Sequence, residues 1–475
     1  MHIMKKCIYV CWLAIGCSAT LSLSAQRIAT WLTNEDKSQL FAPQPGTVSF
    51  RPKAGGEPVI TVNTDSSYQS IDGFGFALTG GSAQPIMKMG AKARAALLQE
   101  LFGTRGREIG ISYLRVSIGA SDLNDHVFSY DDIPAGQSDS ALAHFDLGPD
   151  KDNVIPVLQQ VIKICPAIKI LASPWSPPVW MKTNGDTRGG RLQPQYYGVY
   201  ARYFVKYIEA MKAAGITIDA ITVQNEPLHP GNNPSLLLTA LEEAQFIENH
   251  LGPAFQRAGI RTKIVLYDHN ADRPDYPIFI LDRSKAAKYV AGSGFHLYGG
   301  DISALTDVHN AHPEKNIYFT EQMVVDFAQQ GKIYDSIMHI ANPVKRLIIG
   351  ATRNWSKNVL EWNLAADPEF KPYTDRGGCS SCQGAITLAG DSVSRNLAYY
   401  SIAHASKFVR PGSLRIASNE PDGLPNVAFT TPAGNTVLVV ANTAKTSQSF
   451  SIHYHGQYAS LQLRAGSVAT YVWNK

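Results

Sequence analysis

Cysteine is scarce in this chain, and its distribution excludes several kinds of site. Only 6 of the 475 residues are cysteine, and Cys7, Cys11 and Cys17 belong to an N-terminal segment that we expect to be removed. Cys379 and Cys382 form a lone Cys-Ser-Ser-Cys pair in a glycine-rich stretch. The chain has no second pair to complete four zinc ligands, and this pair does not open a helix after a strand, as a thioredoxin-like motif would. In an exported protein, a local disulfide between the two is the favoured interpretation.

The chain also lacks a strong net charge and a long apolar run. Its formal charge is +4, and it falls by two without Lys5 and Lys6, which argues against nucleic acid as a partner. After the N-terminal segment there is no uninterrupted apolar stretch of roughly 18 residues, so we expect no membrane-spanning segment. There is no internal repeat and no low-complexity tract. We expect a monomer that needs no cofactor and no metal.

Residues 1–26 have the pattern of a secretory signal peptide. Lys5 and Lys6 form the charged part, an apolar stretch follows to Cys17, and Ser22-Leu23-Ser24-Ala25 supplies small residues for cleavage. Ala14-Ile15-Gly16-Cys17 offers a rival lipoprotein cleavage site, although its leucine, Leu13, stands one place too early. We therefore expect an exported protein, periplasmic or extracellular, with a lipid anchor at Cys17 as the alternative.

Short apolar runs alternate with longer amphipathic stretches through the middle of the chain, which is typical of repeated βαβ units. Eight strands are expected, at Gly73–Leu78, Tyr113–Ile118, Ile168–Ala172, Ala220–Val223, Lys263–Tyr267, Gly294–Leu297, Asn316–Thr320 and Asn358–Trp362. Helices are expected at Ala91–Phe102, Asp152–Ile164, Pro194–Ala214, Leu238–Leu251, Ile278–Val290 and Gly331–Ile340. Eight such units predict a (β/α)8 TIM barrel over residues 71–410.

Both ends of the mature chain have strand patterns without helical periodicity. The strands are expected at Gly46–Phe50 and Pro58–Val62 before the barrel, and at Asn435–Asn442 and Ser467–Trp473 after it. We therefore predict an α/β protein in which residues 27–70 and 411–475 together form a β-sandwich side domain attached to the barrel.

Two acidic residues, Glu226 and Glu321, stand at the ends of the fourth and seventh predicted strands. Catalytic groups of such barrels lie at the C-terminal ends of the strands, and these two strands lie across the mouth from one another. Opposed carboxylates suit glycoside hydrolysis, in which one protonates the leaving oxygen and the other attacks the anomeric carbon. A metal site is the alternative, with Asp268, His269 and His296 as further ligands. The aromatic residues around these positions favour a sugar, whose apolar ring faces stack on tryptophan.

The order and spacing of several motifs resemble glycoside hydrolase family 30, the glucosylceramidase-like retaining enzymes. The matching stretches are Ile71-Asp72-Gly73-Phe74-Gly75, Leu114-Arg115-Val116, Ala172-Ser173-Pro174-Trp175-Ser176-Pro177-Pro178, Gln224-Asn225-Glu226-Pro227, Phe319-Thr320-Glu321, Glu361-Trp362-Asn363-Leu364, Ser406-Lys407-Phe408-Val409-Arg410-Pro411-Gly412 and Ser467-Val468-Ala469-Thr470. The resemblance runs from about Gln69 to the C-terminus.

The resemblance implies that Glu226 is the acid/base and Glu321 the nucleophile. It also implies that six residues line the subsite of the cleaved sugar: Arg115, Trp175, Asn225, His296, Tyr298 and Trp362. The expected activity is retaining hydrolysis of β-linked glucosides or glucans. Alternatives are an endo-β-xylanase, a β-galactosidase or β-fucosidase, or a carbohydrate-binding protein without catalysis, and the family also allows a glycosylceramide substrate.

The chain departs from the family pattern at one place. The glucosylceramidase pattern has an acid after the threonine of the first strand loop, whereas this chain reads Leu78-Thr79-Gly80-Gly81-Ser82. We expect this loop to face the sugar and its two glycines to leave open space beside the ring. Ser82 or Asp122 is the alternative source of a group for the same hydroxyls.

Overall fold

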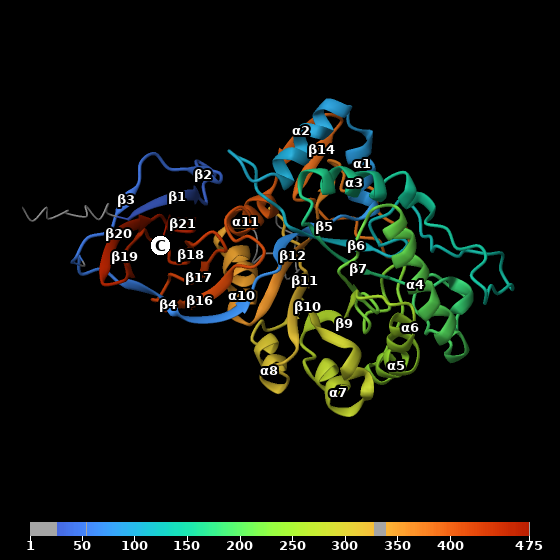
Figure 1. Ribbon diagram of the computed structural model, residues 1–475. Helices are drawn as coiled ribbons and strands as arrows, with labels where there is room; N and C mark the ends of the chain where they lie inside the picture. The colour runs from blue at the N-terminus through green and yellow to red at the C-terminus, as the bar shows by residue number, and fades with distance from the viewer. Residues whose placement is uncertain (1–25, 54, 327–338, 475) are drawn as a thin grey trace, which may run out of the picture.

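The middle of the chain builds one part of the molecule and the two ends together build the other (Figure 1). The computed structural model describes residues 26–53, 55–326 and 339–474. The expected signal peptide with Cys17, and nearly all of the predicted helix Gly331–Ile340, lie outside these residues.

Eight parallel strands close into a barrel, and each corresponds to a predicted strand. They are β5 (Gly73–Ala77), β6 (Tyr113–Ser117), β7 (Lys169–Ser173), β8 (Ala220–Thr222), β9 (Lys263–Ala271), β10 (Val290–Gly300), β11 (Asn316–Glu321) and β12 (Ser356–Asn363). Each pairs with the next, and β12 pairs with β5 to close the ring. The prediction of a (β/α)8 barrel is confirmed. Because these strands are covered on both faces, they appear in the sequence as continuous apolar runs.

Helices cover the outside of the barrel (Figure 1). Those predicted from the sequence are α2 (Ala91–Phe102), α3 (Val154–Ile164), α4 (Tyr197–Ala213), α5 (Ala240–Phe246) and α7 (Asp275–Arg283). Those not predicted are α1 (Gly80–Lys88), α8 (Ala304–Ala311), α10 (Gly350–Arg353) and α11 (Leu397–Ser406). No helix in the described part of the chain is both long and apolar enough to cross a membrane.

Helix α1 shows why the helix propensities of the residues did not predict every helix. It contains two glycines and Pro85, all unfavourable in a helix interior. Thr79 nevertheless caps it by accepting a hydrogen bond from the Ser82 N–H at 3.0 Å, and the helix packs against α3 and the short strand β13 (Ala365–Ala366). Tertiary packing therefore decides this helix.

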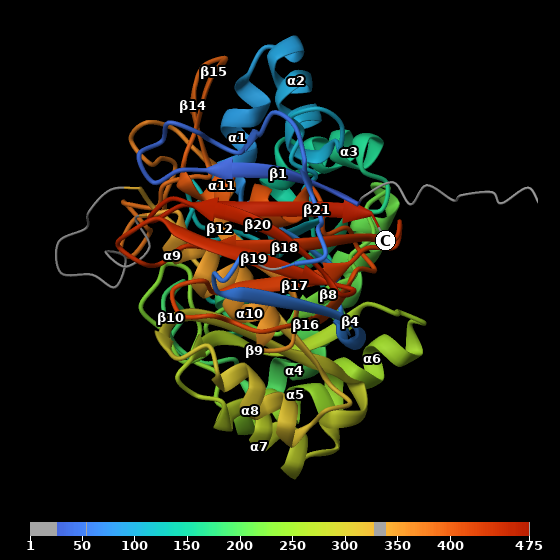
Figure 2. The same ribbon diagram turned by 90° about the vertical axis from the view of Figure 1, so that its left-hand side faces the viewer.

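The side domain takes strands from both ends of the chain, as predicted (Figure 2). From the N-terminal end come β1 (Arg27–Thr33), β2 (Ala42–Pro43), β3 (Val48–Ser49) and β4 (Val59–Ser70), and from the C-terminal end come β16 (Leu414–Ser418), β17 (Asn426–Thr430), β18 (Asn435–Ala441), β19 (Gln448–Tyr454), β20 (Gln457–Leu463) and β21 (Val468–Asn474). The long strand β4 pairs with β16 and also with β19, so it joins the two layers. Between the layers, large apolar side chains such as Phe450 and Trp473 form a separate core.

Helix α11 connects the barrel to the side domain through a buried histidine. His404 lies between the hydroxyls of Thr33 on β1, at 2.7 Å, and Thr470 on β21, at 2.9 Å. Burial lowers the pKa of His404 to about 3. The imidazole is therefore neutral, and it holds both ends of the chain against the barrel.

Candidate active site

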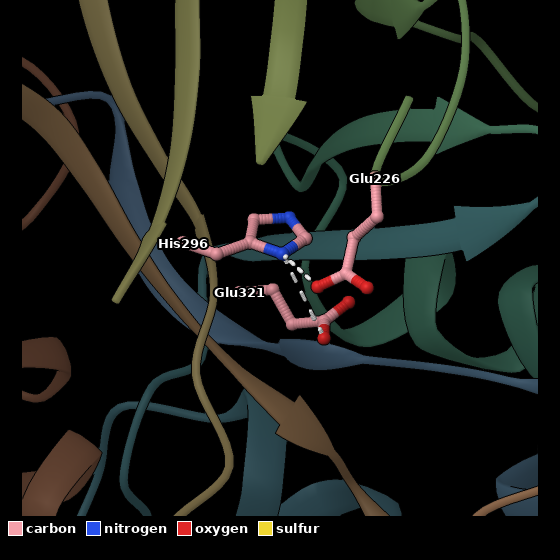
Figure 3. Close-up of side chains that lie close together, drawn as sticks. All are labelled: Glu226, His296 and Glu321. Carbon is pink, nitrogen blue, oxygen red and sulfur yellow. Dashed lines mark hydrogen bonds and ion pairs between the residues drawn. The ribbon is translucent and has the colours of Figure 1, made fainter. Parts of the chain in front are cut away.

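Glu226 lies where strand β8 has ended, at the mouth of the barrel (Figure 3). Its backbone has φ +44°, a left-handed conformation, and its N–H donates to the carbonyl of Asp268 at 3.0 Å. Pro227 follows and cannot donate to a strand ladder. The side chain is 12% exposed, so it can be reached from solvent. The strand end predicted from the sequence therefore presents this carboxylate to the mouth.

Glu321 is the last residue of β11 and is held by two donors. Arg115 Nη1 lies 2.6 Å from its Oε2, and the hydroxyl of Tyr298 donates to its Oε1 at 3.0 Å. Arg115 and Tyr298 are two of the six residues that the family resemblance implied for the sugar subsite. Arg115, on β6, is 1% exposed, so its charge acts on Glu321 with little screening by solvent.

The two carboxylates lie close together with His296 between them (Figure 3). One oxygen of Glu226, one of Glu321 and a ring nitrogen of His296 all lie within 4.8 Å of one another. Nδ1 of His296 is 3.0 Å from Oε1 of Glu226 and 3.9 Å from Oε1 of Glu321.

Asp268 binds the partners of both carboxylates, a role that the sequence did not predict. It was considered only as a metal ligand, although it follows a predicted strand. Its carboxylate is fully buried and binds four side chains, which are Arg115 at 2.7 Å, His296 at 3.0 Å, Thr222 at 2.7 Å and Thr320 at 2.6 Å. Asp268 thus connects Arg115, the cationic partner of Glu321, to His296, the cationic partner of Glu226.

The charges of these groups set where the proton resides. Burial lowers the pKa of His296, but the surrounding carboxylates, Glu321 foremost, outweigh it and raise the pKa to about 9. Burial raises the pKa of Glu226, and the hydrogen bond and charge of His296 outweigh it, so the pKa falls to about 2. Burial also raises the pKa of Glu321, which His296 and Arg115 only partly offset. The resting site therefore carries its proton on His296.

Asn225 is oriented by the same cation. Its Oδ1 accepts a hydrogen bond from Arg115 Nη2 at 2.7 Å. Since the oxygen is engaged, the Nδ2 group is the part of this amide that can donate to a ligand.

Trp175 and Trp362 pack together beside Arg115 rather than presenting open faces. Their ring centroids are 5.5 Å apart, and the Arg115 guanidinium carbon lies 4.8 Å from the Trp175 ring. They are only 2% and 4% exposed. The structure therefore brings both residues to the site predicted for them, but only small parts of their rings can contact a ligand.

A disulfide joins Cys379 and Cys382 in the segment after β12. Both cysteines pack in the apolar cluster that contains Trp175 and Trp362, together with Tyr373. Among the residues that the structure describes, Cys165 has no disulfide partner.

The expectation of open space beside Gly80 is wrong. A Cβ atom at Gly80 would lie 2.0 Å from Nδ2 of Asn124, and one at Gly81 would lie 2.3 Å from the carbonyl of Leu123. Both glycines permit close packing of α1 against this loop and leave no room for a ligand. Ser82 is also engaged, since its hydroxyl donates to Oδ1 of Asn363 at 2.6 Å.

Asp122 is the remaining acid at this side of the site. It is 7% exposed, and Oδ1 has no hydrogen-bond partner among the described residues. Burial, with the charges of Glu321 and Glu226, raises its pKa to about 8. The Oδ1 atom of Asp122 can therefore donate a hydrogen bond to a sugar hydroxyl, or accept one from it.

Glu226, His296 and Glu321 are also the one group of three potential metal ligands found among residues 26–53, 55–326 and 339–474. His269, another suggested ligand, is not part of it. Arg115 already forms an ion pair with Glu321 at 2.6 Å. A divalent cation would meet the repulsion of this guanidinium, so the donor set fits a metal poorly.

Two family models match almost the whole described chain. Residues 71–409 match the glycosyl hydrolase family 30 TIM-barrel domain, and residues 412–471 match the family 30 β-sandwich domain.

Individual relatives match this chain over most of its length and of their own. An endo-1,6-β-D-glucanase of Aspergillus fumigatus is 33% identical over 88% of this chain and 90% of its own length. The lysosomal acid glucosylceramidase of Mus musculus is 28% identical over 89% of this chain and 85% of its own. A solved endo-β-1,6-glucanase structure superposes with a TM-score of 0.86 and 32% identity, covering 94% of this chain and 100% of that one.

Proposed function

Since the chain belongs to glycoside hydrolase family 30, we propose that it cleaves β-1,6-linked glucan with retention of configuration at the anomeric carbon. Glycosidase activity follows from the family itself. The choice of β-1,6-glucan is supported by the endo-1,6-β-glucanases, which are 32–35% identical to this chain.

The separation of the two carboxylates carries the proposal of retention. Ligand oxygens of Glu226 and Glu321 lie within 4.8 Å of one another. Retaining glycosidases place their carboxyl groups about 5–5.5 Å apart, whereas inverting enzymes need about 6.5–9.5 Å to admit a water molecule. In the proposed reaction Glu321 attacks the anomeric carbon, and a covalent glycosyl-enzyme forms. Glu226 protonates the departing oxygen and then removes a proton from the incoming water.

His296 supplies the proton that Glu226 lacks at rest. A general acid must be protonated before the leaving oxygen departs. Transfer from Nδ1 of His296 to Oε1 of Glu226, across 3.0 Å, converts a charged pair into a neutral one. Exclusion of water by a bound sugar favours the neutral pair, because charges lose their solvation. Until it attacks, Glu321 keeps its ion pair with Arg115, which favours the ionised form that the attack needs.

The groups around the pair suit a sugar. Asn225 can donate to the hydroxyl next to the reacting carbon, and Asp122 can bind hydroxyls on the far side. The exposed parts of Trp175 and Trp362 can contact the apolar face of the ring. At Gly80 the chain lacks the acid of the glucosylceramidase pattern, and Asn124 fills that space.

The proposed substrate can be tested by measuring hydrolysis of linear β-1,6-glucan. The rates are compared with those on β-1,3-glucan, β-1,4-glucan, xylan and glucosylceramide. We expect kcat/KM to be highest on the β-1,6-glucan. A higher kcat/KM on glucosylceramide, the substrate in the name of the mouse relative, would contradict the proposal of a β-1,6-glucan substrate. Proton NMR of the first product tests the mechanism, since a β-anomer indicates retention and an α-anomer would rule it out.

We further propose that the protein is exported as a monomer after loss of residues 1–26. The mass of the mature protein distinguishes loss of residues 1–26, which leaves Arg27 as the first residue, from lipid attachment at Cys17.

A further inference from the structure

Strand β9 contains a β-bulge at Tyr267 and Asp268, next to the group formed by Glu226, His296 and Glu321. Tyr267 and Asp268 have φ values of +73° and +60°, although neither is glycine. In the pairing with β10, Gly294 is opposite Tyr267 and Phe295 is opposite His269, so Asp268 is the extra residue. The bulge turns the Asp268 side chain into the barrel. Backbone in this region is strained, and it persists only where surrounding contacts hold it.

Glu243, on helix α5, provides such a contact. Its side chain is 1% exposed, and its Oε1 accepts a hydrogen bond from the Tyr267 N–H at 3.3 Å. Pairing between β8 and β9 has already ended at Thr222 and Val265, two residues earlier. The N–H therefore bonds to a helix side chain instead of a neighbouring strand. Burial of a carboxyl group is costly, and among the described residues this one has only the Tyr267 N–H and the Tyr276 side chain as hydrogen-bond partners to offset the cost.

Asp268 transmits this contact to both sides of the site. Its carboxylate binds Arg115 at 2.7 Å and His296 at 3.0 Å. Its carbonyl accepts the N–H of Glu226 at 3.0 Å. A shift of the bulge would therefore move the partner of each catalytic carboxylate and the backbone of Glu226 together.

We propose that Glu243 is a positioning residue, which acts through the Tyr267–Asp268 bulge to hold Arg115, His296 and Glu226 in register. Its catalytic consequence rests on the function proposed above, but its effect on the bulge does not. The titratable groups that act on Glu243 are Tyr276 from α7 and Asp268 from β9, while Tyr267 contributes its backbone N–H. Burial raises the pKa of Glu243 to about 7. Both the neutral and the ionised form of Glu243 can accept a hydrogen bond from the Tyr267 N–H. The proposed role therefore requires the length of this side chain and an acceptor oxygen, but not its negative charge.

Two conservative variants separate length from charge. Glu243→Gln keeps the length and the acceptor oxygen but loses the ability to ionise. Glu243→Asp keeps the acid but is one methylene too short to reach the Tyr267 N–H. We expect Glu243→Gln to keep kcat within about twofold of the wild type and Glu243→Asp to lower kcat about tenfold to hundredfold, as for an unpaired buried donor, with little change in KM.

A matched control is the neighbouring acid Glu242. It caps α5 by accepting hydrogen bonds from the Thr239 N–H and hydroxyl, and it does not contact the bulge. Glu242→Ala should lower the Tm and leave kcat unchanged. NMR titration of the His296 imidazole supplies a readout without turnover, and Glu243→Asp should lower this pKa while Glu242→Ala should not.

The proposal is overturned if Glu243→Asp keeps wild-type kcat and His296 titration, or if Glu243→Gln is impaired as strongly as Glu243→Asp. If the wild type hydrolyses no glycoside, the proposed function fails, and the His296 titration still decides the role of Glu243.

Discussion

His296 and Glu226 share a hydrogen bond of 3.0 Å between Nδ1 and Oε1, at the point where the proposed leaving group would depart. The opposite nitrogen of the ring is held by Asp268. The imidazole therefore stands between the carboxylates of Asp268 and Glu226. In the proposed mechanism, the His296–Glu226 pair can carry one proton on either residue.

This pair predicts the alkaline limb of the pH profile. Surrounding carboxylates raise the pKa of His296 to about 9, so kcat/KM should fall as the pH rises through about 9 and the pair loses its proton. In His296→Gln the proton must be held by Glu226 alone. The alkaline limb should then move to lower pH, which a pH profile of kcat/KM would measure. An unchanged limb would show that His296 does not hold the catalytic proton.

Replacement of Glu321 should identify the nucleophile. Glu321→Ala should lose turnover and regain it with azide, giving an α-glycosyl azide, because azide attacks from the face that the carboxylate leaves empty. Glu226→Ala with azide should give the β-glycosyl azide instead, and it serves as the control. The reverse stereochemistry in both variants would exchange the two roles.

Arg115 should be needed for stability as well as for activity. Its removal in Arg115→Met leaves Asp268 and Glu321 buried without their cation, which should cost about 3–5 kcal/mol in the free energy of unfolding. Arg115→Lys keeps the charge but loses the planar fork that reaches Glu321, Asp268 and Asn225 together, so kcat should fall with a smaller loss of stability. Urea unfolding and kcat measurements test this. Equal stability of the two variants would contradict it.

His404 should make the protein sensitive to acid. Burial lowers its pKa to about 3 in the folded state, whereas an unfolded histidine titrates near 6.5. Below pH 6.5 the unfolded chain binds a proton that the folded chain does not. Stability is therefore full above this pH and falls by about 1.4 kcal/mol per pH unit toward pH 3.

His404→Gln should weaken this dependence, while His455→Gln, at an exposed position of the side domain, should not. Urea unfolding at pH 4 and pH 7 compares the three proteins. The same pH dependence in all of them would show that His404 does not titrate on unfolding.

The disulfide can be tested by thiol labelling of denatured, unreduced protein. Cys165 should react, since it has no disulfide partner in the described part of the chain, and Cys379 and Cys382 should react only after reduction. Labelling of all three without reductant would exclude the disulfide in solution.

The sequence by itself determined the barrel, the sandwich and the position of the two acids. Buried parallel strands leave continuous apolar runs in the chain, and a strand end at Glu226 is marked locally by Pro227. These signals depend on neighbours in the sequence, so they can be read without the fold. Helices such as α1 could not be predicted from the sequence, because glycine and proline disfavour a helix there and only tertiary packing stabilises it.

Only the tertiary structure decided what surrounds the acids. Asp268 follows a predicted strand like several other polar residues, and its sequence neighbours do not show that a bulge turns it under Arg115 and His296. The space beside Gly80 could not be judged either, because Asn124, which fills it, lies more than 40 residues away in the chain. Burial and the approach of residues distant in sequence set these contacts and the resulting charges, and both arise only when the barrel closes.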